Sequence, residues 1–94
     1  MPGSMRGGVV EEMRDMSKMF GRNAGSLGEI IRNLNSRIVS SDSIWKGPDA
    51  EQFRGEWQDA KAAFERMHKA LQEASTAVTR AAERIERATG PSGR

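Results

Sequence analysis

The chain has 94 residues, 36% of them apolar and 30% charged, and 15 Lys and Arg against 13 Asp and Glu leave a net charge of +2. This length allows one small domain. Because Cys is absent, disulfides, thiolate metal sites and a cysteine nucleophile are excluded. The low content of aromatic residues and Pro argues against a sandwich or barrel of many short strands.

Both ends are expected to be flexible. Residues 1–8 precede the first helical pattern, and residues 1–4 resemble a cloning remnant. Residues 89–94 hold two Gly and one Pro, a composition typical of a frayed tail. No apolar run has the length of a signal peptide or a transmembrane helix.

Apolar residues predict a helix over residues 9–39. Met13, Phe20, Leu27 and Leu34 recur every seven residues, and two neighbouring columns widen them into a broad apolar stripe. Three Gly residues between positions 21 and 28 weaken this pattern, because each costs about 1 kcal/mol relative to Ala in a helix. They indicate either a kink or a close approach of another helix. We expect a continuous helix.

A second helix is predicted over residues 48–88, after a turn at 40–47. Gly47 suits the N-cap position, Pro48 the first helical position, and Asp49 the positive end of the helix dipole. From Ala50 onward, apolar residues recur at alternating steps of three and four, which is the seam of helices that pack at a shallow angle.

These elements predict an all-α fold, an antiparallel helix-turn-helix hairpin that dimerises into a four-helix bundle. One partner helix cannot cover the broad stripe of the first helix, and a small chain without disulfides or metal needs another source of stability. The sequence leaves open whether the second hairpin is identical. The residues expected in the core or the dimer seam are Phe20, Leu27, Ile31, Leu34, Ile38, Phe53, Trp57, Phe64, Met67, Leu71 and Val78.

Catalytic chemistry finds little support in the sequence. His68 is the only His, and with Glu65 it forms the Glu-x-x-His spacing of di-iron bundles. Both residues flank the apolar seam, so a structural, solvated pair is the better interpretation. We expect no enzyme activity, no catalytic residue, no metal and no cofactor.

Nucleic-acid binding is also disfavoured, because basic and acidic residues alternate along the second helix instead of forming a basic stripe. The six Met residues leave contact with a membrane surface open, although core packing accounts for them more simply.

Trp45 lies in the turn. An aromatic side chain there can seal the end of the hairpin as an apolar plug, or it can serve as a recognition element. The two roles are compatible, and we expect the plug on physical grounds.

The central Trp45-Lys46-Gly47 tripeptide, set between two long amphipathic helices in a chain of this length, resembles the W-x-G turn of the WXG100 (ESAT-6-like) family. The resemblance covers about residues 9–88. It implies a virulence-associated protein, made in the cytoplasm and secreted by a type VII (ESX-like) system without a cleaved signal peptide. It also implies a folded dimer with a second WXG100 protein, recognised by a membrane ATPase of the FtsK/SpoIIIE type, with Trp45, Lys46 and Gly47 as the recognition motif.

The chain departs from the family pattern because it contains no Tyr, so the family's C-terminal Y-x-x-x-D/E signal is missing. We favour a heterodimer in which this chain supplies the W-x-G turn and its partner supplies the signal. The missing Tyr is also consistent with a homodimer, with a non-standard family member or with a shortened sequence. The alternative function is a homodimeric helical adaptor or chaperone-like module without its own export signal.

Overall fold

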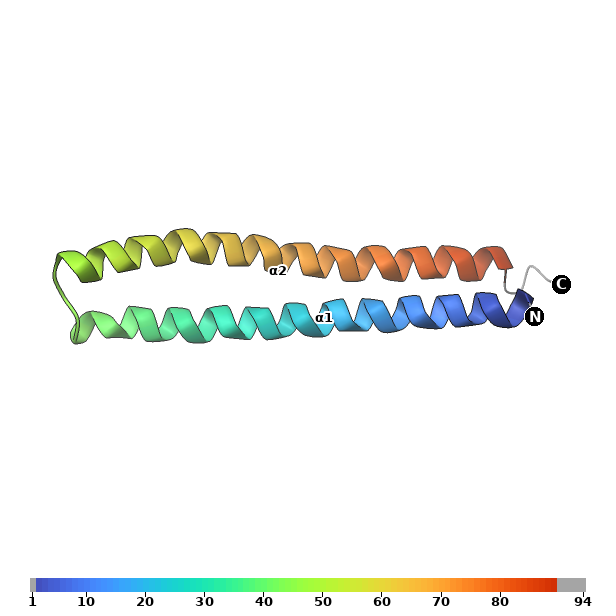
Figure 1. Cartoon of the computed structure of the whole chain (residues 1–94), viewed down its shortest axis with the longest axis horizontal. Helices are drawn as coiled ribbons and strands as arrows, with labels where there is room; N and C mark the ends of the chain where they lie inside the picture. The colour runs from blue at the N-terminus through green and yellow to red at the C-terminus, as the bar shows by residue number, and fades with distance from the viewer. Residues whose placement is uncertain (1, 90–94) are drawn as a thin grey trace. The chain divides into compact units, whose positions relative to one another are not determined.

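Two long helices make up nearly all of the described chain. The computed structural model describes residues 2–89, in which α1 spans Pro2–Ser40, the short 3₁₀ helix η1 spans Ser41–Ser43 and α2 spans Pro48–Thr89 (Figure 1). These residues contain no strand. The predicted all-α helical hairpin is confirmed.

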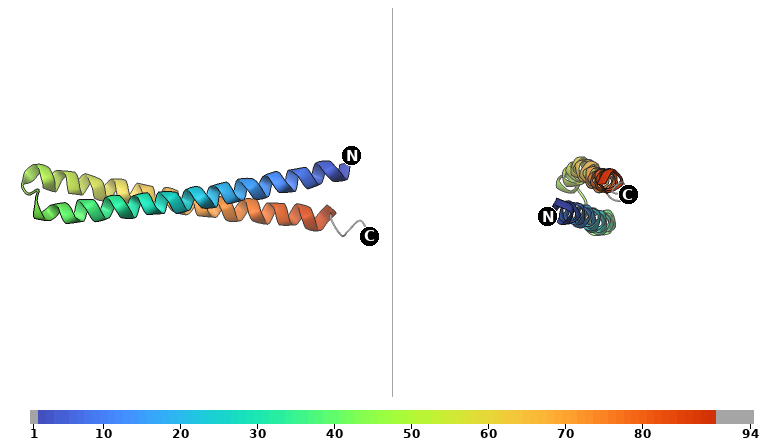
Figure 2. Two further views of the ribbon diagram at one scale, coloured as in Figure 1. Left: turned by 90° about the horizontal axis from the view of Figure 1, so that it is seen from below. Right: turned by 90° about the vertical axis from the view of Figure 1, so that its right-hand side faces the viewer.

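The hairpin divides into two compact units. The terminal unit joins the first part of α1, up to Asn23, to the part of α2 that begins at Leu71, and the turn unit comprises Ala24–Ala70. Within each unit a segment of α1 lies beside an antiparallel segment of α2 (Figure 1 and Figure 2).

The helix bounds differ from those expected at the chain's beginning. α1 begins at Pro2, whereas the apolar pattern predicted a helix from residue 9. The physical reason is that Pro suits the first helical position and that extending an existing helix costs less than nucleating one. α2 ends at Thr89, and the rest of the expected tail, residues 90–94, lies outside the described residues.

α1 continues without a break through its central Gly residues. In the turn unit, a Cβ atom added to Gly28 would lie 3.1 Å from Nε2 of His68, whereas one added to Gly25 would meet nothing within 4 Å. In the terminal unit, a Cβ atom added to Gly21 would lie 3.5 Å from the hydroxyl of Ser75. Gly28 therefore permits a close approach of α2, as one of the two interpretations of these Gly residues requires.

A cluster of hydroxyl groups joins the helices of the terminal unit. The buried Ser17 hydroxyl lies 2.8 Å from the carbonyl oxygen of Ser75 and within hydrogen-bond distance of the Thr79 hydroxyl. In return, the Ser75 hydroxyl donates to the carbonyl oxygen of Ser17 at 2.9 Å. Val10 and Ala82 are buried on the same side of their helices. The buried residues described in this unit thus comprise one hydroxyl side chain and two small or medium-sized apolar ones.

The turn unit has a larger apolar core. Ala24 and Ile31 of α1 and Ala50 and Trp57 of α2 are buried. The Trp57 indole N–H donates to Oδ1 of Asn35 at 3.0 Å, so the polar atom of this large side chain has a partner within the interface. This hydrogen bond ties the two helices together near the middle of the unit.

The two Gly residues of α1 in the turn unit provide a matched stability test. Gly25→Ala should raise the free energy of unfolding by about 0.5–1 kcal/mol, because Ala is the better helix former and the new Cβ meets open space. Gly28→Ala should give a smaller gain or a loss, because His68 must move. Urea unfolding followed by far-UV circular dichroism measures both, and equal gains would contradict the close approach at Gly28.

Candidate functional site

The turn between the helices has a defined backbone. The backbone N–H groups of Ile44 and Trp45 both donate to the carbonyl oxygen of Ser41, at 3.0 and 2.8 Å. Gly47 has a φ of 111°, a conformation that Gly adopts at little cost and other residues rarely adopt. Its carbonyl oxygen accepts the N–H of Glu51 at 3.0 Å, which is the first hydrogen bond of α2. The last residue of the W-x-G tripeptide is therefore a Gly for a conformational reason.

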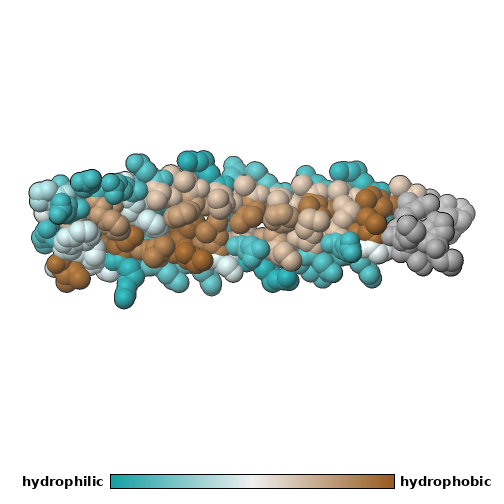
Figure 3. Space-filling model, viewed as in Figure 1, coloured by the Kyte–Doolittle hydropathy of each residue, from teal (hydrophilic) through white to brown (hydrophobic). Residues whose placement is uncertain are grey.

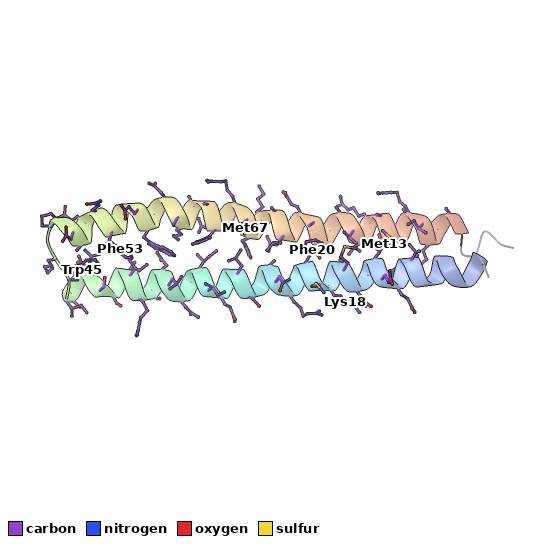
Figure 4. All side chains as sticks on the ribbon, in the orientation of Figure 1. Met13, Lys18, Phe20, Trp45, Phe53 and Met67 are labelled. Atoms are coloured by element: carbon purple, nitrogen blue, oxygen red, sulfur yellow. The ribbon has the colours of Figure 1, made fainter. Side chains whose placement is uncertain are left out.

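Trp45 is only partly covered. Its ring centroid lies 5.6 Å from that of Phe53, and the two side chains meet at the turn end of the hairpin (Figure 4). Even so, 41% of Trp45 and 86% of the preceding Ile44 are exposed. The expected apolar plug is thus partial, because the ring packs on α2 while much of its surface remains available to a partner. Lys46 is exposed beside it.

Arg54 contacts this turn from α2, and sequence reasoning missed it. Its guanidinium donates to the carbonyl oxygen of Trp45 at 2.7 Å and to the hydroxyl of Ser41 at 3.1 Å. It also lies 3.7 Å from a carboxylate oxygen of Asp42 and 5.8 Å from the centre of the Trp45 ring. A signal was present in the sequence, because Arg54 lies four residues after Ala50 and three before Trp57, a spacing that turns it toward α1.

The residues expected in the core or the dimer seam fall into three groups. Two are buried, five are half-buried and four are exposed. The buried residues are Ile31 and Trp57; the half-buried residues are Phe20, Leu27, Ile38, Leu71 and Val78; and the exposed residues are Leu34, Phe53, Phe64 and Met67.

Two exposed apolar residues of the turn unit directly precede residues that face the opposite helix. Leu34 precedes the half-buried Asn35, and Met67 precedes the half-buried His68. One step along a helix is a rotation of about 100°. Because the helices are antiparallel, the row of residues that precede interface positions in α1 and the corresponding row in α2 lie on the same face of the unit. Hydrophobic side chains gather between the helices on the face seen in Figure 3. Helical spacing puts five exposed residues on one side of the interface, and we call them the apolar face: Ile30, Leu34, Phe53, Phe64 and Met67.

The described residues offer no candidate metal centre, since they contain no group of three or more His, Cys, Asp or Glu suited to hold a metal ion. Glu65 is exposed and lies 3.9 Å from the ammonium group of Lys61, while the half-buried His68 packs against Gly28. The two residues of the Glu-x-x-His spacing therefore make separate contacts.

Neither helix could span a membrane, as no stretch in the described part of the chain is both long and apolar enough.

A helical hairpin with a W-x-G turn and an exposed apolar face defines a class of small helical proteins. The family model for proteins of 100 residues with WXG, named WXG100, matches residues 9–88. The chain therefore belongs to the WXG100 family, as its turn and helices indicated.

Relatives and solved structures agree with this assignment. The chain is 28% identical over 76 residues to the protein YukE of Bacillus subtilis, a match that covers 81% of this chain and 78% of YukE. A mutant of the secreted protein EsxB of Bacillus anthracis superposes with a TM-score of 0.80 at 27% identity, covering 86% of this chain and 94% of EsxB. Selenomethionine-labelled EsxB gives a TM-score of 0.77 at 28% identity, with 84% and 90% covered.

The two Trp residues should differ in their effect on stability. Trp57→Ala should lower the free energy of unfolding by about 3–5 kcal/mol, because it empties a buried position and leaves Asn35 without its donor. Trp45→Ala should cost only about 1 kcal/mol and leave helicity unchanged, since this ring is already 41% exposed. Urea unfolding followed by circular dichroism compares them, and an equal loss would show that Trp45 is a core residue.

Proposed function

We propose that this chain is a non-enzymatic secreted protein that a type VII (ESX-like) system exports as a folded dimer with a second WXG100 protein. Its role in the dimer is to present the W-x-G turn to a membrane ATPase of the FtsK/SpoIIIE type. The observation that carries the proposal is the apolar face of the turn unit, which lies beside the helix–helix interface and is left exposed by it.

Apolar area of this kind favours association. Each large apolar side chain that moves from water into an interface contributes about 1.5–3 kcal/mol, before the cost of association is subtracted. A second hairpin laid on this face would bury both rows at once and complete a four-helix bundle. Support from the relatives is that EsxB is described as a secreted protein and shares this hairpin.

The proposal assigns the tyrosine-containing export signal to the partner because the 94 residues of this chain contain no Tyr. It therefore favours a heterodimer. The exposed Trp45 and the Lys46 beside it would then form one half of a composite signal, and the partner's C-terminal segment would form the other half.

Association can be tested on the apolar face itself. Phe64→Glu should weaken dimer formation at least about a hundredfold, because it buries an unpaired charge in the bundle. Ala62→Glu is the matched control, since Ala62 lies on the side of α2 turned away from α1 and is exposed. Light scattering coupled to size-exclusion chromatography gives the mass, with the chain alone and mixed with a second WXG100 protein from the same organism.

A stable mass of twice 10.4 kDa for the chain alone would establish a homodimer and reject the heterodimer preference. A tight 1:1 complex only with the second protein would support the heterodimer. A monomer under both conditions would overturn the dimer proposal.

Export can be tested at Trp45. Trp45→Ala should reduce the secreted amount at least about tenfold in the native host, with the intracellular amount and the dimer mass unchanged, because the side chain contributes to recognition more than to folding. Immunoblots of culture medium and cell lysate measure the ratio. Secretion of this variant at the wild-type amount would overturn the recognition role of the turn.

A further inference from the structure

We propose that Arg54 is the positioning residue of the W-x-G turn, which fixes the backbone and the ring of Trp45 in the orientation that a partner recognises. This inference rests on the proposed function for its biological meaning. Its structural part stands on the contacts of Arg54 alone, and these can be tested separately.

The guanidinium contacts the turn at four points. It donates to the carbonyl oxygen of Trp45 and to the hydroxyl of Ser41, the residue whose own carbonyl oxygen accepts the N–H of Trp45. It pairs with the carboxylate of Asp42, and its Cζ atom lies over the Trp45 ring, 5.8 Å from the centroid. One side chain thus contacts the start of η1, the tryptophan backbone and the indole.

Placing Arg54 at this position lowers the stability of the fold, which argues for a specific role. The side chain is only 22% exposed, and among the described residues its Nε atom is buried without a hydrogen-bond partner. An unsatisfied buried donor costs stability, and an apolar residue facing α1 would avoid that cost. The benefit that Arg supplies and an apolar residue lacks is the set of hydrogen bonds to the turn.

Lys cannot reproduce this arrangement. The guanidinium is planar and holds its donors in a fixed fork, so it can bond two oxygens while stacking on an aromatic ring. An ammonium group keeps the charge but loses both the fork and the planar stacking. Arg54→Lys therefore separates the geometry of the contact from its charge.

Phe53 and Arg54 hold Trp45 from the same helix. The Phe53 ring covers one part of the indole, with the two ring centroids 5.6 Å apart. The guanidinium carbon of Arg54 lies 5.8 Å from the centroid of the Trp45 ring. The remaining surface of Trp45 is exposed. Loss of Arg54 should free the turn backbone and let the indole sample other orientations, while the helices stay paired through Trp57 and Ile31.

The experiment compares Arg54→Met and Arg54→Lys with Arg66→Met and Arg66→Lys in the full chain, in whichever dimer the chain forms. Arg66 is exposed on the opposite side of α2 and is the matched control. The first readout is nuclear magnetic resonance of the two indole N–H groups and hydrogen exchange of the Trp45 backbone amide. The Trp57 indole, bonded to Asn35, is an internal control for folding.

In Arg54→Met the Trp45 amide should exchange at least about tenfold faster and the Trp45 indole signal should shift, with the Trp57 indole unchanged. Arg54→Lys should show part of this change, and the Arg66 variants none. An unchanged Trp45 amide and indole in Arg54→Met would overturn the positioning role. A simultaneous loss of the Trp57 signal would also overturn it, because Arg54 would then be a general structural residue.

The second readout is secretion, measured beside Trp45→Ala. A loss in both Arg54→Met and Trp45→Ala, with dimer mass unchanged, supports the inference. If Arg54→Met is secreted normally while secretion of Trp45→Ala is impaired, the role of Arg54 in recognition is overturned. If Trp45→Ala is itself secreted normally, the proposed function fails, and the resonance and exchange readout alone decides whether Arg54 holds the turn.

Discussion

The close contact between small and polar side chains of α1 and α2 is the constraint on which the rest of the structure depends. In the turn unit, Ala24, Gly28 and Ala50 leave little space between the helices, and His68 fills what Gly28 leaves open. Trp57 and Ile31 still fit into this interface, whereas Leu34 and Met67 lie one residue before interface positions, where helical geometry turns them out of it. The exposed apolar face is therefore a direct consequence of how the hairpin packs on itself.

The same interface explains why the two Trp residues have different roles. Trp57 points into the turn unit, is 7% exposed and has its indole N–H satisfied by Asn35, so it stabilises the fold. Trp45 lies in the turn, where Phe53 and Arg54 of α2 contact its ring. A large aromatic side chain held in place yet left partly exposed is characteristic of a residue that another protein contacts.

The sequence predicted the two helices and the turn, because apolar spacing, Gly47 and Pro48 all act locally. It could not predict which apolar residues face the partner helix, since Met67 and His68 are neighbours and only the register of two helices decides between them. Arg54 was missed for a related reason. Among alternating charges it reads as a solvated residue, and its contacts with the turn depend on a backbone that sequence spacing does not describe.

The contacts that fix register and the contacts left for a partner differ in kind. Within the terminal unit, a slip of one helical turn would break the reciprocal hydrogen bonds between Ser17 and Ser75, in which each hydroxyl donates to the other's carbonyl oxygen. Within the turn unit, it would move His68 away from Gly28. Hydrogen bonds and close approaches are directional and tolerate no such slip, whereas the apolar face offers contacts that depend mainly on area. A hairpin built this way specifies its own register from within, and under the proposed function it leaves pairing to shape and apolar area.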